Sequence, residues 1–242
     1  MATKLTIPHA VKAAETGAYE WLKSRGFVLP CPFETRLPGR ERETNMRTLI
    51  AKLGFRYQHA TLENFELYDD RQREVMARLG KFAESMPDHL KGGGGLMLFG
   101  DPGTGKDHLV AALLKLAVML HRLSVLWFDG GDLYDQIHLA LQTDGDSEWR
   151  KLSDSLRNPH VLAISDPQPP QGALSPQQVR RLRDIIDKRY RAGKSTWLTT
   201  NIDQREFAEQ LFTRPVMERM KEGSGTILCD WSSYRTRRKA GW

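Results

Sequence analysis

Short apolar runs alternate with longer amphipathic stretches over the second half of the chain. Five apolar runs have the length of buried strands and lie at 96–99, 124–128, 160–165, 195–200 and 226–231. Between them, apolar residues recur at helical spacing over 109–120, 132–141 and 175–190. This alternation predicts an α/β fold of three layers, in which helices cover both faces of a mostly parallel sheet.

The first 90 residues carry a helical pattern instead. Apolar spacing predicts helices over 8–25, 43–53 and 69–86, and prolines at positions 30, 32 and 38 separate the first two. Four consecutive glycines at 92–95 come just before the first predicted strand. We therefore expect a small helical region at 1–65, followed by an α/β domain at 66–242.

Composition restricts the class of protein. Of the 242 residues, 40% are hydrophobic and 9% are aromatic, which is enough for a packed core. The two cysteines, Cys31 and Cys229, are too few for a disulfide scaffold and suit a reducing compartment. No apolar run approaches the ~18 residues of a membrane span, and residues 1–27 lack the apolar region of a signal peptide. We therefore expect a soluble, cytoplasmic protein with no membrane partner.

Charge adds one indication of a partner. Lysine and arginine number 36 against 30 aspartate and glutamate, which favours a polyanion such as nucleic acid. The basic excess is concentrated in 176–191 and 230–242. Two interpretations of these segments stay open: a solvated helix face with a basic chain end, or a surface for DNA phosphates.

One motif carries specific chemistry. Residues 100–106 fit G-x-x-x-x-G-K and lie between a predicted strand and a predicted helix, the context that this phosphate-binding motif requires. The glycines let backbone N–H groups turn toward an anion, the helix N-terminus adds positive charge, and Lys106 reaches the β- and γ-phosphates. We therefore predict a nucleotide site. Its predicted contacts are Gly100, Asp101, Pro102, Gly103, Thr104, Gly105, Lys106, Asp107 and His108.

The residue after Lys106 departs from the motif. Asp107 stands where a serine or threonine hydroxyl normally contacts Mg²⁺. A carboxylate can also ligate a hard cation, although its charge beside a triphosphate weakens nucleotide binding unless a metal offsets it. A plain structural interpretation, in which Asp107 only caps the helix, stays open.

A second departure follows the third predicted strand. Hydrolysing P-loop proteins need a carboxylate there to hold Mg²⁺, and a second carboxylate usually polarises the attacking water. Here the strand ends in Ser165-Asp166-Pro167, which offers a single acid. Either Asp166 holds the metal and Pro167 replaces the second acid, or Ser165 replaces the metal ligand and Asp166 is the base. As a plain alternative, Asp166 begins the proline-rich loop at 167–170.

The two departures together indicate an exchange of ligands. The loop has gained a carboxylate at Asp107 and lost a hydroxyl, whereas the strand has a hydroxyl at Ser165. These two side chains could surround one Mg²⁺ with their places exchanged and the total charge kept. Asp107, Ser165 and Asp166 are therefore the candidate metal ligands.

From about Tyr57 to Arg235, roughly three-quarters of its length, the chain resembles AAA+ ATPases of the DnaC/IstB type. These proteins are bacterial helicase loaders and transposition helpers. The matching stretches are ATLENF at 60–65, the loop at 100–109, 158–166, TTN at 199–201, MERM at 217–220 and DWSSYR at 230–235. The resemblance implies a P-loop NTPase fold of the AAA+ kind.

The resemblance also implies roles for three further residues. Asn201 corresponds to a polar sensor near the γ-phosphate, and Arg219 to an arginine finger that completes the nucleotide site of a neighbouring subunit. Arg235 corresponds to the family's second arginine sensor. Arg214 is a rival for the finger, and a turn asparagine or surface arginines are the plain alternatives. With Asp166 as the acid, the candidate catalytic residues are Asp166, Asn201 and Arg219.

The implied cofactors are ATP and Mg²⁺, and the implied partners are single-stranded DNA and a replicative helicase or transposase. Residues 1–65 would dock the protein partner, and ATP would control assembly on DNA. We expect no C-terminal lid, because few residues follow Trp231, so that a neighbouring copy in a homo-oligomer would cover the nucleotide. The departures predict a weak ATPase. The alternative is an adaptor that binds nucleotide without hydrolysing it, and a small-molecule kinase is a third interpretation.

Overall fold

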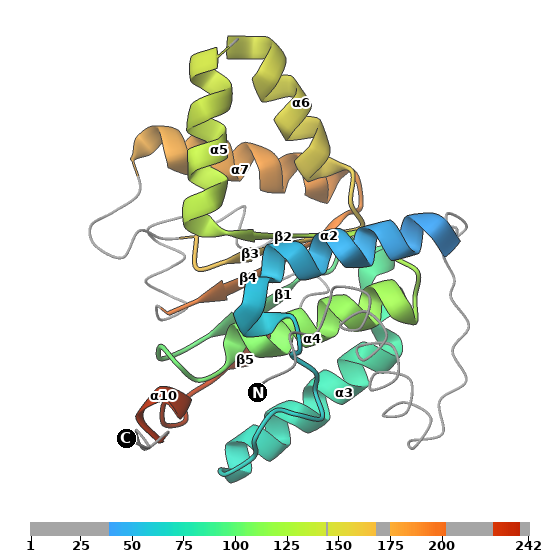
Figure 1. The fold of residues 1–242 in the computed structure, drawn as a ribbon, viewed down its shortest axis with the longest axis vertical. Coiled ribbons are helices and arrows are strands. Elements are labelled where there is room, and N and C mark those ends of the chain that lie inside the picture. Colours follow the sequence, from blue (N-terminus) through green and yellow to red (C-terminus); the bar gives the residue numbers. More distant parts are fainter. Residues whose placement is uncertain (1–38, 144, 168–174, 202–224, 238–242) are drawn as a thin grey trace, which may run out of the picture.

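The computed structural model describes residues 39–143, 145–167, 175–201 and 225–237 (Figure 1). Its centre is a sheet of five strands, in the order β2-β3-β4-β1-β5. Every pairing between neighbouring strands is parallel, which confirms the predicted sheet. The strands are β1 (Leu96–Phe99), β2 (Val125–Asp129), β3 (Val161–Ser165), β4 (Ser195–Thr200) and β5 (Gly225–Leu228).

Helices cover both faces of the sheet, as predicted (Figure 1). Successive strand residues point to opposite faces, so Leu96 and Leu98 join one apolar cluster and Met97 joins the other. The first cluster lies under α2 (Gly39–Tyr57), α3 (Asp70–Lys91) and α4 (Lys106–Met119). The second lies under α5 (Gly130–Thr143), α6 (Gly145–Arg157) and α7 (Pro176–Arg191). A short helix, α10 (Tyr234–Arg237), follows β5.

The helices differ from the predicted pattern in three places. Helix α6 was not predicted, although Trp149, Leu152 and Leu156 recur at helical spacing in an otherwise polar segment. Helix α2 extends beyond the predicted 43–53 at both ends, and α3 continues through Pro87 to Lys91. The helix predicted at 8–25 lies outside the described residues.

Helix α2 packs on α4 and along the outer edge of β2. The Asn45 side-chain amide donates to the Val125 carbonyl at 2.9 Å, and the Val125 N–H donates to the Asn45 side-chain oxygen Oδ1 at 3.0 Å. Near its end α2 bends at Gly54, whose φ of 64° is the left-handed conformation that glycine tolerates. The division of the chain at residue 65 stays a prediction, but α2 itself contacts the sheet layer.

The basic residues of α7 largely serve contacts within the fold. Arg189 is completely buried, and its guanidinium donates to backbone carbonyls at the amino ends of β3 and β4, including His160 and Ser195. Burial lowers the pKa of Arg189 to about 9. Three other cations of this helix have partners, namely Lys188 with Asp184, Arg191 with Asp187, and Arg181 over the Trp149 ring. These contacts leave α7 with much less free positive charge than its composition indicates.

Among the described residues, no helix combines the length and apolar character that a membrane crossing requires.

We predict that Asn45→Ala lowers the free energy of unfolding by about 1–3 kcal/mol, because it leaves a buried N–H and a buried C=O of Val125 without partners. Urea unfolding measures the change. Thr44→Ala is the matched control, since Thr44 is exposed and donates only to the Arg40 carbonyl of its own helix. Equal losses in the two variants would contradict the edge-pairing role of Asn45.

Candidate nucleotide site

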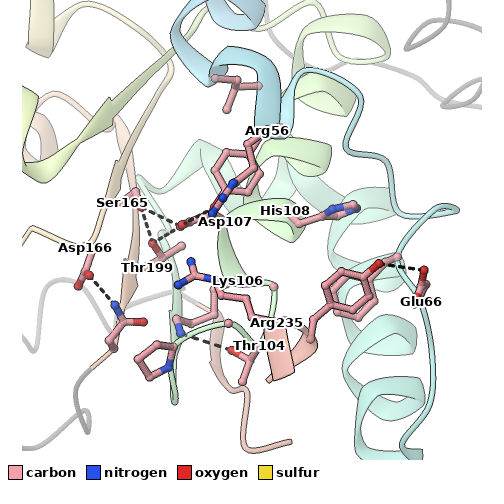
Figure 2. Close-up of a pocket in the computed structure, with 18 of the residues that line it drawn as sticks. Arg56, Glu66, Thr104, Lys106, Asp107, His108, Ser165, Asp166, Thr199 and Arg235 are labelled. Carbon is pink, nitrogen blue, oxygen red and sulfur yellow. Dashed lines mark hydrogen bonds between the residues drawn. The ribbon is translucent and has the colours of Figure 1, made fainter. Parts of the chain in front are cut away.

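The phosphate-binding motif connects β1 to α4 at the carboxyl edge of the sheet, where it borders a cleft of about 910 Å³. This volume lies within the ~300–1,000 Å³ typical of small-molecule sites. Side chains enter the cleft from the ends of β3 and β4, from the end of α2, from 64–72 and from 234–235 (Figure 2). The site therefore collects residues that are far apart in the sequence.

Two glycines let the loop follow its path. Gly103 has a φ of 84°, and a Cβ there would lie 2.1 Å from the Ser233 hydroxyl oxygen. Gly105 has a φ of 91°, and a Cβ there would lie 2.6 Å from the Phe65 ring. Gly105 is also the N-cap of α4 and offers no side-chain cap, so the first amides of the helix remain available to an anion. The loop thus has the conformation of a phosphate cradle.

The 60–65 and 230–235 stretches, which carry much of the family resemblance, hold this loop. The Trp231 indole N–H donates to the Thr104 carbonyl at 2.9 Å, and the Tyr234 backbone N–H donates to the Gly103 carbonyl at 2.9 Å. The Phe65 ring makes an edge contact with the Trp231 ring, with centroids 6.4 Å apart. These contacts fix the loop between two distant parts of the chain.

Lys106 and Thr104 point back along the loop. The Lys106 ammonium group donates to the carbonyls of Gly100 and Asp101, each at 2.8 Å, and burial lowers its pKa. The Thr104 hydroxyl donates to the Asp101 carbonyl at 2.9 Å, while Pro102 lines the cleft. The ammonium group therefore lies at the loop, where a bound phosphate would meet it.

His108 turns away from the loop. Its Nε2 lies 2.9 Å from the Thr61 carbonyl, and its ring packs against Phe65. Burial lowers the pKa of His108. The described contacts of His108 are therefore with residues 61–65, and its predicted contact with nucleotide stays a prediction.

Two arginines enter the cleft. Arg235, predicted as a sensor, lines the cleft from α10, and its backbone N–H donates to the Ser233 hydroxyl at 3.2 Å. Its side chain lies beside the phosphate loop at Gly103. Arg56, at the end of α2, points toward Asp107 (Figure 2). Sequence reasoning missed Arg56, because it belongs to the segment assigned to partner docking.

Asp107 is the centre of a hydrogen-bonded cluster. Its Oδ1 accepts from the Ser165 hydroxyl at 2.8 Å and from the Thr199 hydroxyl at 2.6 Å, and its Oδ2 accepts from the Tyr57 hydroxyl at 3.3 Å. Burial and the Asp107 charge raise the pKa of Tyr57 to about 12. The Asp107 carboxylate therefore faces β3 and β4 and does not cap α4. Thr199 and Tyr57 were not predicted, and only the match at 199–201 drew attention to Thr199.

Asp166 faces a different partner. It follows the last residue of β3 with a φ of 45°, rare for a residue other than glycine, and its N–H donates to the Thr199 carbonyl. The Asn201 amide donates to its carboxylate at 2.5 Å. The pKa of Asp166 is raised, mainly because the carboxyl group is partly buried. The two adjacent residues at the strand end thus diverge, with Ser165 at Asp107 and Asp166 at Asn201 (Figure 2).

The donor set fits a magnesium ion bound together with a nucleotide. The described residues contain no group of three or more histidine, cysteine or acidic side chains that would hold a metal by itself. Mg²⁺ is commonly held by one or two carboxylates plus substrate phosphates, and here one carboxylate meets two hydroxyls beside the loop. Arg219 and its rival Arg214 lie outside the described residues.

Comparison with known proteins agrees with this geometry. The model of the IstB-like ATP binding protein family matches residues 27–241. The replicative helicase loader DnaC of Escherichia coli K12 is 26% identical over 241 residues, covering 97% of this chain and 93% of DnaC. A crystal structure of the DnaC helicase loader superimposes with a TM-score of 0.63 at 25% identity, over 72% of this chain and 99% of that one.

The fold is shared more widely. The replication initiator DnaA, in a structure with AMPPCP and single-stranded DNA, has a TM-score of 0.58 at 18% identity, over 74% of this chain and 51% of that one. The parallel sheet, the phosphate-binding loop and the nearly full-length family match lead to one assignment. The chain belongs to the IstB-like ATP-binding proteins, the DnaC/IstB type of AAA+ ATPase.

Proposed function

We propose that this protein is a cytoplasmic helicase loader, which binds ATP with Mg²⁺ and places a replicative helicase on single-stranded DNA. The observation that carries the proposal is the phosphate loop, held in shape by residues 60–65 and 230–235. Similarity to a helicase loader over 97% of the chain supports this function over transposition, the other activity in the family resemblance.

In this proposal the loop amides and Lys106 bind the β- and γ-phosphates, and Arg235 approaches them from its place beside Gly103. Mg²⁺ would neutralise phosphate charge and orient the γ-phosphate. Asp166 takes a proton from the attacking water, and Asn201 positions Asp166 through its amide hydrogen bond. The raised pKa of Asp166 suits a general base. This arrangement supports the interpretation in which Ser165 takes the metal-ligand position and Asp166 is the base.

The first test of the proposal is helicase loading. The protein is mixed with the replicative helicase encoded in the same genome and with circular single-stranded DNA. We expect a complex with the helicase, and ATP-dependent transfer of the helicase to the circle. Binding to a transposase instead would favour transposition. A parallel phosphate-release assay, with and without the DNA, distinguishes slow hydrolysis from an adaptor that only binds nucleotide.

A second prediction concerns the loop. Gly103→Ala forces the loop away from Ser233 and adds ~1–2 kcal/mol of left-handed strain, so we expect ATP affinity to fall roughly tenfold or more. Titration with a fluorescent ATP analogue measures it. The control is Gly39→Ala, because a Cβ at Gly39 meets nothing within 4 Å. Unchanged affinity in Gly103→Ala would contradict the assigned site.

A third prediction concerns the neighbouring copy. If Arg219 completes the nucleotide site of the next subunit in a homo-oligomer, ATP affinity rises with protein concentration. We expect Arg219→Ala to remove this dependence and Arg214→Ala to keep it. The readouts are ATP titration at several protein concentrations and light scattering for the oligomer. An affinity that does not change with concentration in a monomeric wild-type sample would argue against a shared site.

A further inference from the structure

The two residues at which the chain departs from the P-loop pattern are in direct contact. The Ser165 hydroxyl donates to Asp107 Oδ1 at 2.8 Å, although the residues are 58 positions apart. Thr199, on the strand next to β3, donates to the same oxygen at 2.6 Å. The Ser165 and Thr199 hydroxyl oxygens lie 3.3 Å apart. One carboxylate oxygen and two hydroxyls therefore meet beside the phosphate loop.

In a typical P-loop protein the metal-binding groups at these two positions are the reverse of those at Asp107 and Ser165 here. The residue after the loop lysine supplies a hydroxyl to Mg²⁺, and the strand end supplies the carboxylate. Here the carboxylate stands on the loop side at Asp107 and the hydroxyl on the strand side at Ser165. The pair keeps one negative and one neutral oxygen donor, so its total charge equals that of the usual pair.

We propose that Asp107 and Ser165 have exchanged roles, so that Asp107 supplies the carboxylate ligand of the magnesium nucleotide and Ser165 supplies the hydroxyl. This inference rests on the proposed ATP binding and specifies the metal ligands of that site. Thr199 shares the hydroxyl side, and its hydrogen bond orients the Asp107 carboxylate. An exchange of roles requires that the Asp107 and Ser165 side chains lie close enough to ligate the same metal ion. Their hydrogen bond shows that they do.

The rival ligand is Asp166, and the contacts argue against it. Its carboxylate is bound by the Asn201 amide, on the side of the strand end away from Asp107 (Figure 2). Its backbone is also fixed, because the Tyr134 hydroxyl donates to the Pro167 carbonyl at 2.8 Å and Gly130 packs on the Asp166 carbonyl. Asp166 thus faces Asn201, whereas Asp107 faces the Ser165 and Thr199 hydroxyls, which are oxygen donors for a metal.

The exchange predicts a specific pattern of rescue. Asp107→Thr leaves both positions with hydroxyls and no carboxylate. Ser165→Asp places two carboxylates within hydrogen-bonding distance, where their charges repel. The double variant Asp107→Thr/Ser165→Asp restores one carboxylate and one hydroxyl in the usual order. The exchange therefore requires that the second substitution repairs the first.

The experiment measures ATP affinity of the full chain by titration calorimetry, once with Mg²⁺ and once with EDTA. The readout is the ratio of the two dissociation constants. We expect each single variant to lose about 10–100-fold of the Mg²⁺ enhancement. The double variant should recover most of it. Affinity in EDTA should change less, because the loop amides and Lys106 remain in place.

Two further variants guard against trivial effects. Asp107→Asn keeps the shape of the side chain and an acceptor for the hydroxyls, so it tests the charge in a chain that folds. We expect it to lose the Mg²⁺ enhancement as well. Asp135→Thr removes an exposed carboxylate of α5 and so changes the net charge by the same amount as Asp107→Thr. It should leave the ratio of the two ATP dissociation constants unchanged. Thermal melting of each variant reports whether it is folded.

The outcomes separate the exchange from the function on which it rests. A double variant that binds magnesium nucleotide worse than either single variant would overturn the exchange alone. An Asp107→Asn variant with an unchanged Mg²⁺ ratio would do the same and would return the metal to Asp166. A wild-type chain that takes up no ATP in either condition would overturn the proposed function and the exchange with it.

Discussion

The hydrogen bond from the Trp231 indole to the Thr104 carbonyl ties the phosphate loop to a segment that follows the last strand of the sheet. The loop contains three glycines with positive φ, Gly100, Gly103 and Gly105, and no side chain caps the helix that follows it. Hydrogen bonds from Lys106 and Thr104 hold the loop from within, and contacts from Trp231, Tyr234 and Phe65 hold it from outside. The same contacts bring Arg235 and residues 64–68 to the cleft. They therefore determine both the shape of the phosphate loop and which side chains line the cleft around it.

A second constraint is the packing of α2 on the P-loop helix. Lys115 of α4 is nearly fully buried and donates to the carbonyls of Tyr57, Gln58 and Ala60, at the end of α2 and just beyond it. Burial lowers the pKa of Lys115 to about 7. This connection places the Tyr57 hydroxyl at Asp107, so that a segment outside the sheet contributes to the centre of the site.

Sequence reasoning was reliable where a local pattern determines the structure. The five strands, the parallel sheet and the loop followed from apolar run length and one motif, because buried parallel strands and phosphate loops have strong local signals. Helix α6 was overlooked, although the helical spacing of Trp149, Leu152 and Leu156 could have identified it. The contact between Asp107 and Ser165 was only a hypothesis, since strand order decides which strand end lies beside the loop. The burial of Arg189 was also unpredictable, because its partners are backbone carbonyls, which any sequence supplies.

The distance along the chain between Thr104 and Trp231, 127 residues, has a consequence for biosynthesis. A ribosome that has just completed the loop has not yet made the indole that supports it. Until Trp231 is made, the nascent chain therefore carries the phosphate motif without the contacts from 231–234 that help to hold it. Docking of the segment at 230–235 is therefore a late step in forming the nucleotide site, because it supplies contacts that complete the loop.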